Sequence, residues 1–138
     1  MRVLRDASFE EVQQCFRREN QCSNSFDWTN QQLVKLSSGQ WKYVLLARSD
    51  ILMITTPSHS HGRELEVDST IRTAVEKLPR AGECWDNVTS HRNRDFSETH
   101  VFLQCEAGQL AHLDGFHRLL AWVIFDKEKE VPAYVVWA

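Results

Sequence analysis

Three side chains that can perform acid–base and anion chemistry lie close together in the sequence, at Asp114, His117 and Arg118. A carboxylate can accept a proton or bind Mg²⁺, an imidazole can donate or accept a proton near neutral pH, and a guanidinium can bind two phosphate oxygens at once. Gly115 follows Asp114, and glycine lets the backbone approach a ligand closely. The spacing predicts an anion-binding turn with a base beside it.

The residues on either side of this turn predict the elements that position it. The apolar run Leu110–Leu113 predicts a strand, and the amphipathic segment after the turn predicts a helix. The first backbone N–H groups of a helix have no partners within the helix and lie at its positive end. We expect the N–H groups of Gly115 and Phe116 to hold phosphate together with Arg118. The structural alternative makes Asp114 the helix N-cap and places Arg118 in a surface ion pair.

Composition limits the class of protein. The chain has 138 residues, of which 42% are hydrophobic, and this predicts one globular domain with its own core. A net charge of -3 argues against a nucleic-acid partner, and no apolar run reaches the roughly 18 residues of a membrane helix. The cysteines form no CxxC pair and no signal peptide is evident, so we expect reduced thiols and a cytoplasmic location. These cysteines are Cys15, Cys22, Cys84 and Cys105.

The order of patterns along the chain predicts an α+β fold in a single domain, residues 1–138. Residues 1–40 are expected to be an N-terminal helical extension, with a first helix capped by Ser8, and residues 41–138 the core. The core is expected to contain two hairpins and two helices, a long surface loop over residues 80–100, and a last strand. The hairpins are predicted at 41–56 and 101–113, the helices at 70–78 and 116–125, and the strand at 131–137.

The C-terminal third of the chain resembles the ParB/sulfiredoxin-like superfamily. The resemblance rests on the second hairpin, the motif Asp114-Gly-Phe-His-Arg118, the helix after it, and the strand Val131-Pro-Ala-Tyr-Val-Val136. A looser likeness to the superfamily's first motif covers Ile54-Thr-Thr-Pro57 and the loop with Arg63 and Glu64. The resemblance implies a small mixed sheet with flanking helices.

The form of this motif is most similar to the free-serine kinase branch, in which it binds nucleotide phosphates. The resemblance implies a phosphotransferase that uses Mg²⁺ with ATP or ADP and acts on a small hydroxyl- or amino-acid-like metabolite, as in specialised metabolism. Asp114 or Glu64 would accept the substrate proton, and His117 would stabilise the developing charge. The nucleotide phosphates would contact Gly115, Phe116, Arg118, His61 and Arg63.

Other classes of function stay open. Sulfiredoxins carry Cys at the place of Phe116, which argues against their sulfinic-acid chemistry. A non-catalytic ParB-like module that binds a nucleotide as a switch is one alternative, although the acidic charge and the absence of a downstream DNA-binding domain argue against DNA contact. A metal-dependent hydrolase or nuclease is another, with His59 and His61 as ligands beside His112 or His117. The sequence sets no oligomeric state.

Overall fold

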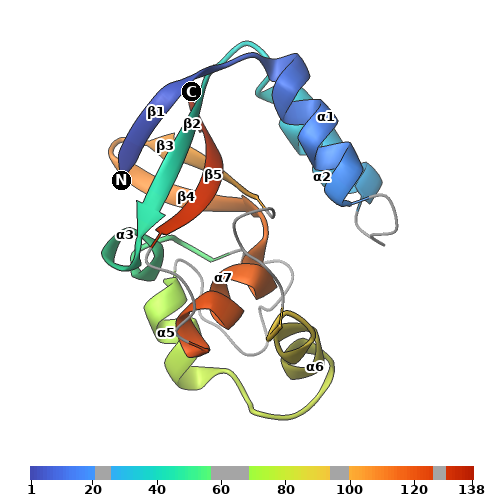
Figure 1. Ribbon diagram of the computed structural model, residues 1–138, viewed down its shortest axis with the longest axis vertical. Coiled ribbons are helices and arrows are strands. Elements are labelled where there is room, and N and C mark those ends of the chain that lie inside the picture. Colours follow the sequence, from blue (N-terminus) through green and yellow to red (C-terminus); the bar gives the residue numbers. More distant parts are fainter. Residues whose placement is uncertain (21–25, 57–68, 94–99, 126–129) are drawn as a thin grey trace.

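The computed structural model describes residues 1–20, 26–56, 69–93, 100–125 and 130–138. They form an α+β fold with a five-stranded mixed sheet, which confirms the predicted fold class at this level (Figure 1). The strands are β1 (Arg2–Ala7), β2 (Gln40–Ala47), β3 (Val101–Glu106), β4 (Gln109–Asp114) and β5 (Glu130–Trp137). The helices are α1 (Phe9–Glu19), α2 (Phe26–Lys35), α3 (Arg48–Leu52), α5 (Ile71–Lys77), α6 (Glu83–Ser90) and α7 (Phe116–Ile124). Among these residues, no helix is long and apolar enough to span a bilayer.

The sheet has the order β1-β2-β5-β3-β4, with β5 at its centre. The β3–β5 pair is parallel, and the other three neighbouring pairs are antiparallel. All residues of β5 except the first and last are buried, because helices cover both faces of the sheet. Side chains alternate along a strand, so Ala133 and Val135 join one core while Tyr134 and Val136 join the other.

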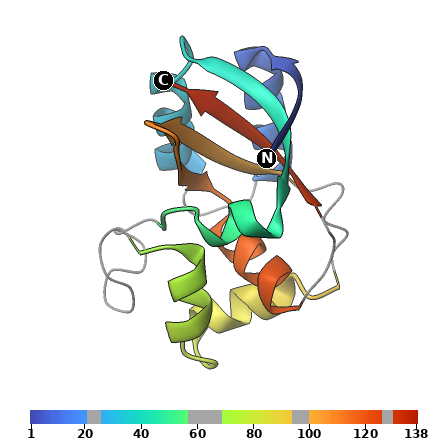
Figure 2. The ribbon, with the colours of Figure 1, turned by 90° about the vertical axis from the view of Figure 1, so that its left-hand side faces the viewer.

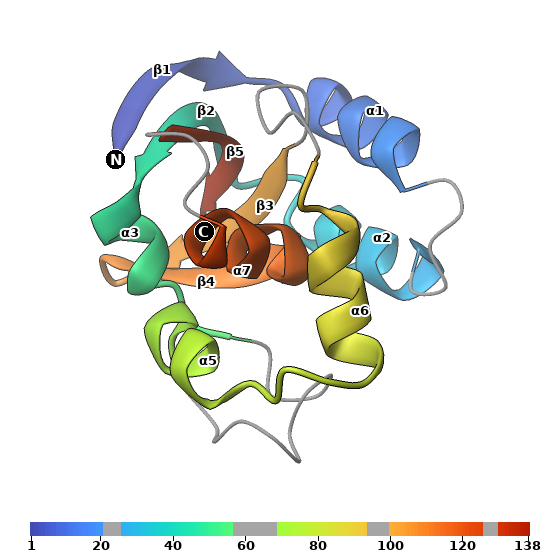
Figure 3. The ribbon, with the colours of Figure 1, turned by 60° about the horizontal axis from the view of Figure 1, so that its bottom comes forward.

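The two cores lie on opposite faces of the sheet. The larger core packs α3, α5, α6 and α7 against one face, and the smaller core packs α1 and α2 against the other. Figure 3 shows α7 with α3, α5 and α6 around it, whereas α1 and α2 stand together at the side. In Figure 2, α3 lies between the strands and α5. The layers join at Arg118 near the start of α7, which contacts Glu19 at the end of α1 and the carbonyl of His100 just before β3.

Residues 1–40 do more than form the helical extension that we expected. Their two helices are present, and the capping of α1 by Ser8 is confirmed, since its hydroxyl accepts from the N–H of Glu11 at 3.1 Å. However, β1 pairs with β2 in the sheet, and Val12 and Leu33 are fully buried in the smaller core. These residues therefore complete both the sheet and the core.

The predicted hairpin over residues 41–56 is wrong in its second half. The strand β2 is present, but it runs directly into the short helix α3. The Asp50 carboxylate accepts a hydrogen bond from the N–H of Ala47 at 2.9 Å, which stabilises the first turn of that helix. Ile51 and Ile54 are fully buried. A short apolar run fits a buried helix as well as a strand, and here core packing favours the helix.

The predicted surface loop over residues 80–100 is also wrong in part, because its described portion contains α6. Gly82 precedes this helix, and Val88 on its inner face is fully buried. The second hairpin, the helix after the turn and the last strand are confirmed as β3–β4, α7 and β5.

Candidate functional site

The strand–glycine–helix turn predicted from the sequence is present. β4 ends at Asp114, α7 begins at Phe116, and Gly115 between them has a left-handed backbone with φ of 105°. A Cβ atom added to Gly115 would lie 2.6 Å from Cγ1 of Val101 on the neighbouring strand. Both the backbone angle and this close approach therefore require glycine.

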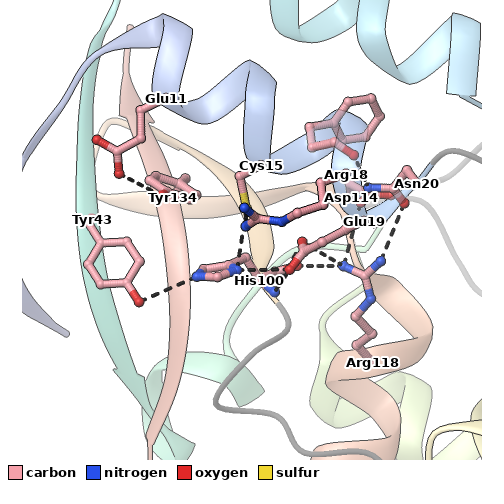
Figure 4. Close-up of polar contacts among 11 residues, drawn as sticks. Glu11, Cys15, Arg18, Glu19, Asn20, Tyr43, His100, Asp114, Arg118 and Tyr134 are labelled. Carbon is pink, nitrogen blue, oxygen red and sulfur yellow. Dashed lines mark hydrogen bonds and ion pairs between the residues drawn. The ribbon is translucent and has the colours of Figure 1, made fainter.

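Arg118 lies within the first turns of α7 and points into the protein, with 9% of its surface exposed. Its guanidinium donates to the carbonyl oxygen of His100 and, at 3.4 Å, to Oδ1 of Asn20. The nitrogen Nη1 lies 3.8 Å from Oδ2 of Asp114 and 4.0 Å from Oε2 of Glu19 (Figure 4). We call these five residues the polar junction, because their contacts join α1, β3, β4 and α7.

This arrangement bears on the predicted phosphate clamp. Protein oxygens surround the guanidinium, and the carboxylates of Glu19 and Asp114 both compete for its charge. A phosphate would have to displace these groups to bind Arg118 with two hydrogen bonds. The clamp stays a prediction, and the geometry described here gives Arg118 a positioning role within the junction.

The pKa of the Asp114 carboxyl is raised above its ordinary value. Burial raises its pKa, the charge of Arg118 lowers it, and the nearby carboxylate of Glu19 raises it again; burial is the largest of these effects. Its Oδ2 atom is inaccessible to solvent and accepts no hydrogen bond from the residues that the structure describes. A carboxylate with a raised pKa is a better proton acceptor than an ordinary one, which suits the predicted role as a base.

Among the other predicted residues, Phe116 and His117 make side-chain contacts with groups outside the junction. Phe116 is 4% exposed and its side chain packs in the larger core, so only its backbone is suited to a ligand. His117 places Nε2 3.2 Å from Sγ of Cys84 on α6. The remaining candidates, His59, His61, Arg63 and Glu64, lie outside the described residues.

A second group of polar side chains shares Glu19 and His100 with the junction, and the sequence reasoning missed it. Cys15 and Glu19 lie one turn apart on α1, and the Nδ1 atom of His100 faces both. This nitrogen lies 3.4 Å from Sγ of Cys15 and 2.9 Å from Oε1 of Glu19. The other ring nitrogen, Nε2, lies 3.4 Å from the hydroxyl of Tyr43. The i, i+4 spacing on α1 was the available signal, but nothing in the sequence pointed to His100 as the third member.

This group differs from a nucleophilic triad. In such a triad the nucleophile and the orienting acid occupy opposite nitrogens of the imidazole, whereas Cys15 and Glu19 both face Nδ1. Burial also raises the pKa of the Cys15 thiol to about 12, so the thiolate required for attack is scarce at neutral pH. The arrangement brings together a sulfur, a nitrogen and an oxygen that can all donate electron pairs.

A cavity of about 240 Å³ lies between α2 and the β3–β4 hairpin, and we call it the α2–β4 groove. Its lining contains one ammonium, one imidazole, two amides and one indole, and no carboxylate among the described residues. The lining residues are Trp28, Gln32, Lys35, Leu36, Gln104, His112 and Leu113. Such a lining favours a small anionic ligand.

No family model, curated protein or solved structure matches the chain. The features of the chain that bear on function are therefore the junction, the Cys15 group, the groove and the motif Asp114-Gly-Phe-His-Arg118.

Proposed function

We propose that this chain is an enzyme that transfers a phosphoryl group from ATP or ADP to a small hydroxyl-bearing or amino-acid-like metabolite. The observation that carries the proposal is a buried carboxylate with a raised pKa, Asp114, at a strand–glycine–helix turn. In phosphoryl transfer, a carboxylate near the attacking hydroxyl accepts its proton, and this base works best when its pKa approaches the working pH. Asp114 is accordingly the proton acceptor in our proposal.

The arrangement around the turn also supports a ParB/sulfiredoxin-like fold as the finer description. The β3–β4 hairpin leads into Gly115, α7 follows, and β5 then pairs in parallel with β3. This is the element order that the resemblance implies. The fold assignment is part of the proposal.

The phosphates are assigned to the α2–β4 groove instead of to Arg118. Lys35 and His112 supply positive or hydrogen-bonding groups there. The half-exposed indole of Trp28 offers a flat surface on which the nucleobase can stack. The groove and the proton acceptor Asp114 both lie along β4, since the groove lining includes Leu113, the residue before Asp114. At about 240 Å³ it accommodates a small metabolite or one end of a nucleotide.

Mg²⁺ is the alternative partner of the Asp114 carboxylate, since a carboxylate bound to Mg²⁺ no longer serves as the base. Mg²⁺ in nucleotide enzymes binds one or two carboxylates together with the phosphates, and the Asp114 side chain as a whole is 19% exposed. When bound, the ion would neutralise phosphate charge. Arg118 in turn holds Asp114 in place, and His117 keeps its predicted role of stabilising developing charge.

The binding half of the proposal is tested by thermal shift with Mg²⁺-ATP, Mg²⁺-ADP and Mg²⁺-CTP. Lys35→Gln removes the ammonium of the groove and is expected to abolish the nucleotide-induced shift. Lys77→Gln is the matched control, because Lys77 likewise ends a helix but lies on α5, away from the groove. Loss of the shift in Arg118→Lys but not in Lys35→Gln would return the phosphates to the predicted clamp. No shift with any nucleotide would refute the proposal.

The catalytic half is tested by measuring ADP or AMP release with a panel of hydroxy amino acids and small alcohols. Asp114→Asn is expected to lose turnover while it keeps the nucleotide-induced shift, because the amide cannot accept the proton. Nucleotide binding by the wild-type chain without turnover on any substrate would favour the ParB-like regulator.

A further inference from the structure

The cluster of Cys15, Glu19 and His100 has the composition of a transition-metal site. The candidate donor atoms Sγ, Oε and Nδ1 all lie within 4.8 Å of one another. Cys15 is 4% exposed, and the side chains of Glu19 and His100 are 10% and 12% exposed. The cluster is therefore shielded from solvent, and it draws its members from two elements that are distant in sequence.

The spacing of these atoms suits tetrahedral coordination. Zinc binds sulfur at about 2.3 Å and nitrogen or oxygen at about 2.0–2.2 Å, which places neighbouring ligand atoms roughly 3.3–3.6 Å apart. The observed separations are 3.4 Å between Sγ and Nδ1 and 2.9 Å between Nδ1 and Oε1. The third separation, between the Cys15 sulfur and the Glu19 oxygen, is within 4.8 Å, so the Glu19 side chain has to move to complete the fit.

The backbone N–H of His100 donates to the Glu19 carboxylate at 3.0 Å, but the ring of His100 cannot donate to both of the groups that its Nδ1 atom faces. A single ring nitrogen, Nδ1 of His100, faces both the thiol of Cys15 and the carboxylate of Glu19. It carries at most one hydrogen, so it can donate to only one of the two groups. A divalent ion at the centre would be bound by all three donors at once.

The surroundings are those of a supported metal site. The hydroxyl of Tyr43 lies on the outer nitrogen of His100, and such an outer contact orients a ligating imidazole. Two guanidiniums oppose an added cation, since Arg18 places Nη2 3.7 Å from the Cys15 sulfur and Arg118 lies 4.0 Å from the Glu19 carboxylate. A thiolate and a carboxylate balance the charge of a divalent ion, which lowers the free-energy cost of holding it in a buried place. The two anionic ligands must offset the repulsion from the guanidiniums as well.

We propose that Cys15, Glu19 and His100 bind Zn²⁺ or a similar borderline divalent ion, as a site with three protein ligands. Three such ligands with one remaining position is the arrangement of catalytic zinc sites, whereas structural sites use four. A thiolate and an imidazole favour Zn²⁺ over Mg²⁺, which prefers oxygen ligands. The site uses neither Asp114 nor a residue of the α2–β4 groove, although it shares Glu19 and His100 with the polar junction.

The test uses the full chain without a histidine tag, stripped of metal and titrated with Co²⁺ and then Zn²⁺. We expect one ion per chain and, with Co²⁺, a thiolate-to-cobalt charge-transfer band in the near ultraviolet. Cys15→Ala should remove this band, and Glu19→Gln should lower Zn²⁺ affinity by about tenfold or more, since even outer-shell changes lower affinity about 10–100-fold. Because Cys15 is buried, circular dichroism must confirm that each variant is folded; if Cys15→Ala does not fold, Glu19→Gln and His100→Gln decide the outcome.

Two matched cysteine controls locate the site. Cys105→Ala alters another buried cysteine, and Cys84→Ala alters the cysteine beside His117; both should keep the band and the stoichiometry. Loss of the band in Cys84→Ala but not in Cys15→Ala would overturn the proposal. Absence of stoichiometric binding by the folded wild-type chain would do the same. No nucleotide is present in this experiment, so its failure is separable from failure of the proposed phosphotransferase.

Discussion

Replacing Arg118 by Met tests whether this arginine holds the polar junction together. Met keeps much of the side-chain length but removes the charge and every N–H donor. The change leaves the carboxylates of Glu19 and Asp114 without their common cation, and the His100 carbonyl loses a hydrogen bond. Breaking one side of a buried ion pair costs about 3–5 kcal/mol. The side chain of Arg118 is only 11% exposed, so solvent screens this loss little.

The expected loss is a large share of the stability of a small domain, which is about 5–15 kcal/mol. For a chain of this length it corresponds to a fall in Tm of roughly 10–17 °C. Urea unfolding followed by tryptophan fluorescence and circular dichroism measures the loss, with an unchanged m-value as evidence that the unfolding transition is comparable. Asp114 can take up a proton in the variant, so we expect the deficit to shrink as the pH is lowered toward 4.

Arg2→Met is the matched control. Arg2 forms a 2.9 Å ion pair with Glu130, but its side chain is 61% exposed, and such a pair contributes about 0–1 kcal/mol. If Arg118→Met proved as mild as Arg2→Met, the guanidinium could not be the buried hub that the contacts indicate. The predicted phosphate clamp, in which Arg118 serves the ligand more than the fold, would then be the better account.

Two further predictions concern the turn and the N-terminal ion pair. Gly115→Ala should lower the free energy of unfolding by about 1–3 kcal/mol or more, because alanine is strained at φ of 105° and its Cβ would meet Val101. The control Gly108→Ala carries only the backbone strain, since φ is 79° there and nothing lies within 4 Å of the added Cβ. Equal losses in thermal melts of the two variants would contradict this reasoning. The hydrogen bond from Arg5 lowers the pKa of Glu11 below its ordinary 4.5, so the folded state binds this proton less readily than the unfolded chain. The stabilisation is therefore present above pH 4.5 and lost as the pH falls through the lowered pKa, and Glu11→Gln should flatten that part of the pH dependence of the urea midpoint.

Local signals in the sequence predicted the elements that depend on local physics. A serine three residues before a glutamate begins α1, and a glycine between an apolar strand and an amphipathic segment begins α7. The same kind of reasoning did not identify α3, because four apolar residues carry too little periodicity to separate a helix from a strand. Core burial of Ile51 and Ile54 decides that segment.

The sequence by itself determined that Asp114, Gly115 and Arg118 would meet at one turn, since they are neighbours along the chain. Only the tertiary structure decided which way Arg118 points and what surrounds it, because its partners on α1 and β3 come from other layers of the fold. The contact between Cys15 and His100 spans 85 positions of the chain. Spacing rules do not reach across such a distance; it is the packing of α1 against the sheet that brings a sulfur, a carboxylate and an imidazole together.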